Sequence, residues 1–349
     1  MTFPAVDQLT ISRSIQAGGF FRRVRPLGKA AKEWLHFCVI TPEVRVVLNF
    51  SLSRGVDEGS GVARLICVLR DETGCNGDVV TLAPEDVSIR AGKLDAQFGD
   101  SNVRFEDGRF RLRACIPRRN LELDLELVPR TLPMIVQNIQ AGVGAALHWF
   151  LVPRLLATGR VVSNGREHRV EGAPAYHDHN WGTFRWGGEF SWTWGYGLPL
   201  DASVPWSFIM DHFMNRAGTR TRARALLIWK GPLHHRMFRD RSLEVEQHGL
   251  LRPERVFRVP RALAFGCPDA LCGVPERVIL RGASGDDRVE VEMKCGEVSQ
   301  ILVPSEEDEG LTLINEVECE THLHGVVAGE RVEMKGAGML EHLGHWHAR

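Results

Sequence analysis

Strict alternation of apolar and acidic residues is the feature of this sequence that most restricts its fold. Leucine occupies every second position of Leu121–Leu127, and glutamate or aspartate occupies the positions between. A period of two places the leucines on one face of an extended strand and the acids on the other. This pattern is typical of a half-buried antiparallel strand. The segment therefore predicts a β-sheet with one face in a core.

Turn signals divide the chain into short strands. Asp107-Gly108 lies between two alternating segments, and Asn164-Gly165 lies within Arg160–Arg166. Asp-Gly and Asn-Gly are the pairs that two-residue hairpin turns prefer. Helical patterns are short and few, so the sequence predicts an all-β protein built of barrels or sandwiches. With 349 residues, 44% of them hydrophobic, the chain can hold two barrels of similar size joined near residues 170–200.

The charge balance bears on the partners of the protein. Lys and Arg (43) nearly equal Asp and Glu (44), and the net charge is −1. This balance favours no nucleic acid and no anionic membrane as partner. The eight cysteines include no C-x-x-C pair, which favours free thiols in a reducing compartment. Because the first residues also lack a charged region followed by an apolar run, we expect a cytoplasmic protein.

One charge-free segment keeps membrane contact open as an alternative. Residues 131–153 contain no Asp, Glu, Lys or Arg. Pro133, Gly142, Gly144 and several amides interrupt the segment, which disfavours a membrane-spanning helix. It predicts either a buried segment that lines a ligand cavity or a surface that touches a membrane peripherally to collect lipid.

The segment Tyr176–Trp181 carries the densest set of proton-exchanging side chains. It places a phenol, two imidazoles, a carboxylate, an amide and an indole in consecutive positions. In an extended strand the odd-numbered residues share one face and the even-numbered residues share the other. An acid–base site beside an apolar ligand needs such groups, whereas the alternative is a hydrogen-bonded plug inside a barrel. The catalytic candidates are Tyr176, His177, Asp178 and His179.

A metal site is the first competing interpretation. His177 and His179 have the H-x-H spacing of many metal ligands, as do His322 and His324. A cupin-like metal barrel carries a glutamate four or five residues after its H-x-H pair. This chain has no acid at that distance from His177 and His179. The second pair alternates in phase with glutamates, which predicts an outward polar face. The sequence also lacks a G-x-S-x-G nucleophile elbow and a glycine-rich phosphate cradle. We expect no metal and no other cofactor.

Aromatic residues follow the motif closely. Indole faces stabilise a cationic or polyene ligand, although large rings also serve as ordinary core packing. The expected substrate-binding residues of this region are Trp181, Trp186, Trp192, Trp194 and Tyr196.

The stretch Gly172–Gly182 resembles the signature of the AttH-like and carotenoid 1,2-hydratase (hydroxyneurosporene synthase) family. Lys32–Phe37 is similar to an early E-W-W-Y-type strand of that family, and Gly336–Gly344 is similar to its C-terminal G-x-G-x-x-E strand. The resemblance implies two lipocalin/calycin-like antiparallel β-barrels in tandem, over residues 1–185 and 186–349. It also implies an apolar ligand held in or between them.

The resemblance further implies roles for single residues. The family's hydratases use a His and a Trp two positions apart, which match His179 and Trp181. They also use a Tyr and an Asp two positions apart, further along the chain. Asp211 matches that acid, but Ile209 stands where the tyrosine would be, so an earlier tyrosine would have to substitute. Trp34, on the strand similar to the early E-W-W-Y segment, is expected in the ligand site.

Residues and resemblance together predict an acid–base enzyme without cofactor. Its expected partner is a hydrophobic small molecule, an isoprenoid or polyketide-like substrate, and its expected reaction is hydration of a C=C bond. Two alternatives stay open: a cyclase or isomerase of Diels–Alder or tocopherol-cyclase type, and a non-catalytic lipid- or terpenoid-binding protein. No feature of the sequence bears on the oligomeric state.

Overall fold

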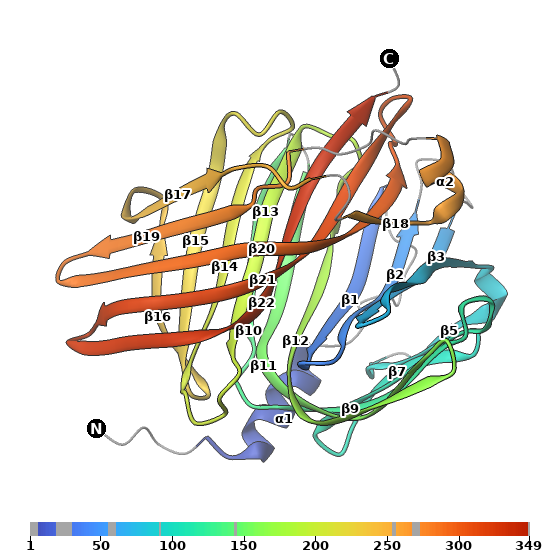
Figure 1. Cartoon of the computed structure of the whole chain (residues 1–349), viewed down its shortest axis with the longest axis horizontal. Coiled ribbons are helices and arrows are strands. Elements are labelled where there is room, and N and C mark those ends of the chain that lie inside the picture. The colour runs from blue at the N-terminus through green and yellow to red at the C-terminus, as the bar shows by residue number, and fades with distance from the viewer. Residues whose placement is uncertain are drawn as a thin grey trace. The chain divides into compact units, whose positions relative to one another are not determined.

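The computed structural model describes residues 6–18, 30–54, 61–90, 92–142, 145–252, 256–266 and 273–347. The chain divides into two compact units, Met1–Phe184 and Arg185–Arg349. Each unit is built on one large sheet, and among the described residues all pairings are antiparallel except that of β18 with β20. The expected all-β architecture of tandem lipocalin-like barrels is confirmed (Figure 1).

The N-terminal unit contains a 12-stranded sheet. Its strands follow the order β4-β3-β2-β1-β12-β11-β9-β8-β7-β6-β5, and β10 pairs with β11 beside this path. The elements are α1 (Gln8–Gly18), β1 (Ala31–Ile40), β2 (Arg45–Arg54), β3 (Gly61–Asp71), β4 (Gly74–Leu82), η1 (Pro84–Asp86), β5 (Val87–Ile89), β6 (Asp95–Phe98), β7 (Ser101–Glu106), β8 (Arg109–Ile116), η2 (Pro117–Arg119), β9 (Leu121–Pro129), β10 (Met134–Gly142), β11 (Ala145–Ser163) and β12 (Arg166–Thr183).

The alternating segment forms β9, as its pattern predicts. All four leucines of Leu121–Leu127 are buried in the core of the unit, whereas Glu122 and Asp124 are exposed. Both predicted hairpin turns are present, because Asp107 and Asn164 adopt the positive φ that such turns require. The period of two and the turn residues thus determine this part of the sheet.

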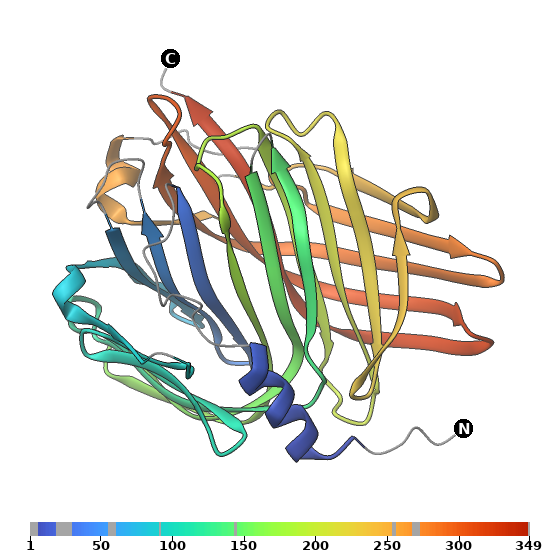
Figure 2. The ribbon, with the colours of Figure 1, turned by 180° about the vertical axis from the view of Figure 1, so that it is seen from behind.

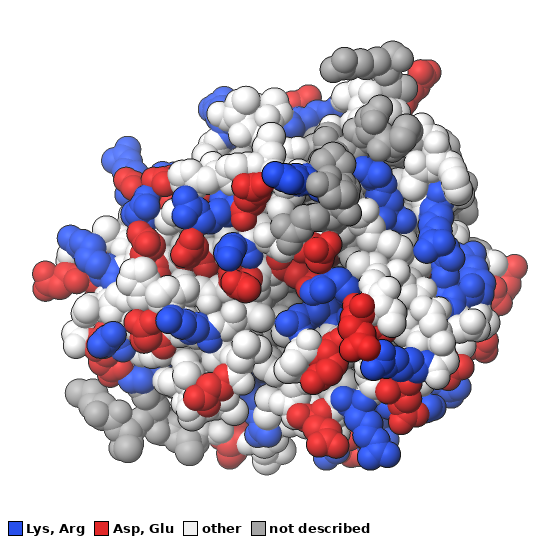
Figure 3. Space-filling view, in the orientation of Figure 1, with Lys and Arg blue, Asp and Glu red and all other residues white. Residues whose placement is uncertain are grey.

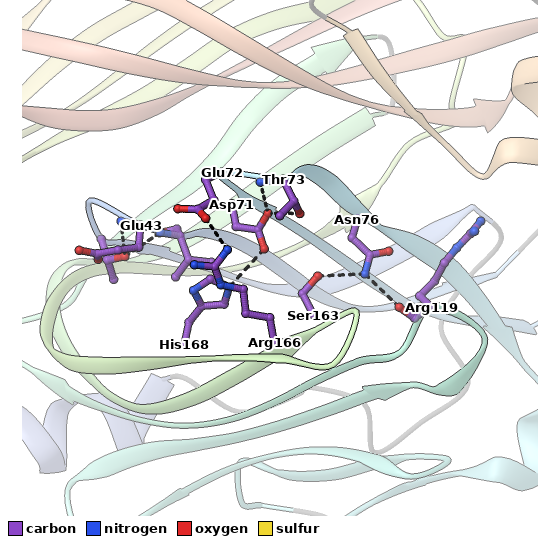
Figure 4. A network of polar contacts seen from close by, with 11 residues as sticks. Glu43, Asp71, Glu72, Thr73, Asn76, Arg119, Ser163, Arg166 and His168 are labelled. Carbon is purple, nitrogen blue, oxygen red and sulfur yellow. Dashed lines mark hydrogen bonds and ion pairs between the residues drawn. The ribbon is translucent and has the colours of Figure 1, made fainter.

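Polar side chains join β4, the edge strand, to the far side of the barrel (Figure 4). The Asn76 Nδ2 group donates to the Arg119 carbonyl at 2.9 Å and to Ser163 Oγ at 3.1 Å. The Asp78 carboxylate lies 2.8 Å from the Arg119 guanidinium. Nearby, His168 Nε2 lies 3.2 Å from an oxygen of Asp71. Among the described residues, side-chain contacts thus join this edge strand to η2 and to the end of β11.

Helix α1 lies at one end of the N-terminal strands (Figure 2). Its Ile11 and Ile15 are buried in the core of the unit, and Gly18 lies against the Phe150 ring. The charge-free segment forms β10 and the first half of β11. Most residues of β11 there are buried, whereas Ile135 of β10 is 44% exposed. Within the described residues, no helix is long and apolar enough to cross a membrane.

The C-terminal unit contains a 10-stranded sheet in the order β16-β15-β14-β13-β22-β21-β20-β19-β17, with β18 parallel to β20. Strands β15 and β16 at one edge lie against β17 and β19 at the other. The elements are β13 (Phe190–Pro199), β14 (Trp206–Asn215), β15 (Thr221–Lys230), β16 (Leu233–Arg239), η3 (Asp240–Ser242), β17 (Leu243–His248), β18 (Val256–Val259), α2 (Arg261–Gly266), β19 (Arg277–Ser284), β20 (Asp287–Pro304), β21 (Gly310–Val327) and β22 (Glu330–His347).

Charges of both signs interleave over β19 to β22 (Figure 3). They form cross-strand ion pairs, such as Arg281 with Glu290 at 2.9 Å. His322 belongs to this polar face, as predicted, and its Nε2 lies 2.8 Å from Glu333. Among the described residues, no group of three or more His, Cys, Asp or Glu side chains could hold a metal ion.

Candidate functional site

The motif Tyr176–Trp181 lies in β12, between β1 and β11. His179 lies opposite Leu35 of β1 and Phe150 of β11, and both of these neighbours belong to the core. The odd-numbered residues of the motif therefore face the interior of the N-terminal barrel, and the even-numbered residues face the opposite side. This division confirms the two faces predicted from the sequence.

A buried acid–base pair lies on the interior face. His179 Nε2 lies 2.8 Å from Glu33 Oε1, and their side chains are 0% and 1% exposed. The Trp181 ring lies 5.0 Å from the His179 ring and stacks on His148 at 5.3 Å. Glu33 was absent from the sequence prediction, although it stands in the segment similar to the family's early strand. Only the pairing of Glu33 with Trp181 across β1 and β12 brings this carboxylate to the imidazole.

His177, the other interior histidine, is a packing residue of the core. Its ring stacks on Phe37 at 4.1 Å and lies 4.6 Å from the Phe110 ring. Nδ1 lies 2.9 Å from the His36 carbonyl oxygen, to which it donates when it carries the proton. Burial holds the pKa of His177 well below its ordinary value, and among the described residues its Nε2 has no hydrogen-bond partner. A neutral imidazole is therefore fixed among aromatic rings.

The opposite face of β12 holds the second half of the motif. The Tyr176 hydroxyl donates to Asp178 Oδ2 at 2.9 Å, and the Asn180 amide donates to Oδ1. Trp34 of β1 lies on this face opposite Asn180, with its ring 6.1 Å from Phe184. Tyr176 and Asp178 are thus brought together, on the other side of the strand from His179.

The remaining residues that were predicted for the ligand site lie in the C-terminal unit. Trp192, Trp194 and Tyr196 alternate along one face of β13, and all three are buried. Asp211 of β14 lies directly opposite Trp194. Trp186 precedes the strand and its ring lies 6.2 Å from that of Trp192. The predicted constellation therefore divides between two units, each with its own acidic and aromatic groups.

The environment of Asp211 changes its acidity. Its side chain lies on a face of β14 between Ile209 and Phe213, and the residue is 9% exposed. Burial and, to a smaller degree, the charge of Asp240 raise the pKa of Asp211 to about 7, against the backbone hydrogen bond from Ala225. At pH 7, about half of the protein molecules therefore carry a proton on Asp211.

Two further carboxyls continue the row that starts at Asp211. Glu341 of β22 lies opposite Trp194 on its other side, and Glu316 of β21 lies opposite Glu341. The Trp192 indole N–H donates to Glu341 Oε1. Burial raises the pKa of Glu341. Neither glutamate was predicted as a site residue, because only the register of four strands aligns residues so distant in the sequence. Glu316, in phase with His322 and His324, was expected on the outward polar face, but it is buried.

The sequence prediction also did not include a polar layer inside the C-terminal barrel. Thr193 Oγ1 lies 3.1 Å from His342 Nδ1 and accepts from the Gln247 amide at 3.0 Å. His212 Nε2 lies 2.8 Å from Thr221 Oγ1. Burial lowers the pKa values of His212 and His342 to about 4, so both rings are neutral at pH 7.

No protein-family model matches the sequence, and no curated protein matches it significantly. Solved structures do match. The AttH candidate NE1406 from Nitrosomonas europaea superposes with a TM-score of 0.60 at 13% identity, over 93% of this chain and 97% of that one. The chain has the AttH-like, lipocalin-like fold.

Two other structures share this AttH-like fold. Kievitone hydratase from Nectria haematococca has a TM-score of 0.54 at 14% identity, over 90% of this chain and 89% of its own. CghA, solved with Sch210972, has a TM-score of 0.56 at 12% identity, over 92% of this chain and 90% of its own. At such identities the likeness establishes the fold.

Proposed function

We propose that the protein is a cofactor-independent acid–base enzyme that protonates a hydrophobic small molecule. The observation that carries this proposal is the Asp211 carboxyl, which is buried opposite Trp194 with its pKa raised to about 7. A general acid works best when its pKa lies near the operating pH. An ordinary exposed aspartate is almost fully ionised at neutral pH and has no proton to give.

The aromatic residues around Asp211 suit the charge that protonation creates. Protonation of an alkene leaves a carbocation, and an indole face stabilises a nearby cation by roughly 2 kcal/mol when water is excluded. Trp194 lies directly opposite the acid, and Trp192 lies on the same face of β13. An acid beside two buried indoles supports the protonation of a C=C bond.

Hydration is the reaction that we favour. Asp211 gives its proton to one alkene carbon, water adds to the other carbon, and the water loses a proton that restores the acid. The name of kievitone hydratase, which shares the fold, agrees with this reaction. Attack by a nucleophile within the substrate would instead give a cyclase. The expected substrate is an isoprenoid or polyketide-like alkene.

The Glu33–His179 pair is a second candidate for proton transfer. The carboxylate orients the imidazole, as in other His–carboxylate pairs. Trp181 completes an imidazole–indole wall on the same face. We propose His179 as a general base and Glu33 as the residue that positions it.

The test uses the full-length protein with a panel of acyclic terpenoid and polyketide alkenes in H₂¹⁸O, with products identified by mass spectrometry. Asp211→Asn is expected to lower kcat/KM for a hydrated alkene by about 10²–10⁴-fold, the usual contribution of a general acid. Asp201→Asn, in the exposed turn between β13 and β14, is the matched control and should leave the rate unchanged. An Asp211→Asn variant that stays within about threefold of the parent would refute the assignment.

A ligand carrier is the second candidate function. Ile209 occupies the position where the resemblance requires a tyrosine, so the face of β14 beside Asp211 is more apolar than in a hydratase. A carrier would return its bound ligand unchanged. Native mass spectrometry of the purified protein distinguishes the two functions, because an enzyme incubated with that ligand yields a product shifted by the mass of water or an isomer.

A further inference from the structure

We infer that Glu316 and Glu341 form a carboxyl pair that shares one proton and serves as a second acid of the C-terminal unit. The register of β21 and β22 places the two residues directly opposite each other, with their side chains on the same face. Carboxyls that face each other across adjacent strands are close enough to form a hydrogen bond. A hydrogen bond between two carboxyl groups requires that one of them carries a proton.

Burial strengthens the case for a shared proton. Glu316 is 3% exposed, so water does not screen the charge of its carboxylate. Two like charges at hydrogen-bond distance in such an environment do not ionise together, so the pair loses its protons in two well-separated steps. The Trp192 indole N–H donates to Glu341 Oε1, which fixes the orientation of one carboxyl and favours its ionised form. Trp192 is thus a positioning residue.

The other titratable groups on this face reinforce the effect. Asp211 on β14 and Glu318 on β21 are acidic, and their negative charges would oppose full ionisation of the pair. His345 on β22 is held neutral by a pKa lowered by burial, and its Nε2 lies 2.9 Å from the Phe190 carbonyl. Tyr196 on β13 is uncharged at neutral pH.

The catalytic part of this inference rests on the proposed function. Trp194 lies between two acids, with Asp211 opposite it on β14 and Glu341 opposite it on β22. The alkene π electrons take the proton that the pair shares and form the new C–H bond, while the O–H electron pair stays on the carboxylate that releases it. Water bonds to the resulting carbocation and returns one proton to the pair. The acid is thereby restored without any co-reactant.

Infrared spectroscopy tests the shared proton without substrate. The full-length protein is produced with glutamate labelled by ¹³C at the side-chain carboxyl, which separates glutamate bands from that of Asp211. We expect about one protonated glutamate per chain at pH 7 in the parent. Glu316→Gln and Glu341→Gln should each lower the pH at which that band disappears, because the remaining buried carboxyl loses its like-charged neighbour. Glu318→Gln, on the same face, should leave that pH unchanged.

Kinetics test the catalytic role. Glu341→Gln should lower kcat/KM by about 10²-fold or more at every pH. Glu316→Gln should lower the rate at pH 7 and recover it at pH 5, since the remaining acid titrates at a lower pH. A purely structural role would not produce that recovery. Circular dichroism of each variant confirms that it folds.

Two results would overturn the inference. The first is a glutamate band that is absent from the parent at pH 7, or that disappears at the same pH in the parent and in both single variants. The second is full activity of Glu341→Gln on an alkene that requires Asp211. Failure of the proposed function looks different, because Asp211→Asn would then be fully active while the infrared band of the pair stayed in place.

Discussion

At the scale of single residues, this protein places charged and titratable side chains where water does not reach them. Glu33, His179 and Glu316 are each at most 3% exposed. A buried charge without a partner costs several kcal/mol, so each such residue depends on its neighbour. The motif Tyr176–Trp181 indicated titratable groups but not their partners. The partners lie on neighbouring strands of the sheet and are distant in the sequence.

The Glu33–His179 pair can be tested through stability. Glu33→Ala should lower the free energy of unfolding by about 3 kcal/mol, because it leaves a buried imidazole without its carboxylate. Glu33→Gln should cost less, since the amide oxygen still accepts a hydrogen bond. Urea denaturation measures both. Glu333→Gln, which breaks the exposed pair with His322, is the control and should cost less than about 1 kcal/mol. Equal effects at the two sites would contradict the buried pair.

The pH dependence of stability follows from buried histidines. Burial lowers the pKa values of His36, His212 and His342 from 6.5 to about 4. Between these values the unfolded chain binds protons that the folded chain does not, so stability falls as the pH falls from 6.5 to 4. Asp211, with its pKa raised to about 7, has the opposite sign, so its contribution to stability increases as the pH falls through this whole range.

We therefore expect the free energy of unfolding to fall by about 1–3 kcal/mol between pH 7 and pH 5. The decrease should be larger in Asp211→Asn, because that variant lacks the opposing contribution. Urea titrations at both pH values measure the two decreases. A smaller decrease in Asp211→Asn than in the parent would show that the aspartate does not hold a proton in the folded state.

At the scale of elements, the sequence predicted strands well and their neighbours poorly. The alternation of Leu121–Leu127 and the turns at Asn164-Gly165 are local signals, and both are confirmed. The two faces of Tyr176–Trp181 also follow from a period of two. The opposition of Glu33 to Trp181, or of Glu316 to Glu341, depends on register, which no local pattern specifies.

Two glycines of β22 have a structural role in the sheet of the C-terminal unit. Gly336 and Gly338 lie within the strand, where β22 passes close to β13. A Cβ atom at Gly338 would lie 1.8 Å from the Tyr196 carbonyl oxygen, and one at Gly336 would lie 1.9 Å from that of Leu198. The G-x-G pattern here permits close approach of two backbones rather than binding of a phosphate.

This close approach makes a strong prediction for stability. Gly338→Ala should lower the free energy of unfolding by more than about 2 kcal/mol, because β13 and β22 would have to separate. Gly266→Ala, where an added Cβ meets nothing within 4 Å, is the control and should have little effect. Thermal unfolding followed by circular dichroism compares the two variants. Comparable midpoints would mean that the strands accommodate a methyl group.

At the scale of the whole molecule, ion pairs between distant strands help to close the sheet of each unit. In the N-terminal unit Asp78, 6% exposed, pairs with Arg119 beside the contacts of Asn76. In the C-terminal unit Arg236 of β16 pairs with Asp287 of β20 at 2.8 Å. Closure of this kind leaves no sequence motif, since the paired residues are about 40 or more positions apart and read as ordinary surface charges.

Loss of the Asp78–Arg119 ion pair should destabilise the N-terminal unit alone. Asp78→Ala is expected to lower stability by about 2–4 kcal/mol, because Arg119 loses its largely buried partner. Hydrogen exchange should accelerate in β4 and β9, while β13 and β22 keep their protection. Arg90→Ala, which breaks an exposed pair with Asp95, is the control. Faster exchange in both units would show that they unfold as one.

The two-sided character of β12 limits how this segment can change in evolution. Each residue of Tyr176–Trp181 belongs to one of two chemical environments, according to whether its number is odd or even. A one-residue insertion or deletion would exchange the environments of His179 and Asp178 at a stroke. The segment therefore tolerates a substitution far better than a change of length. Variants selected for new ligands should accumulate substitutions here, but no insertions or deletions.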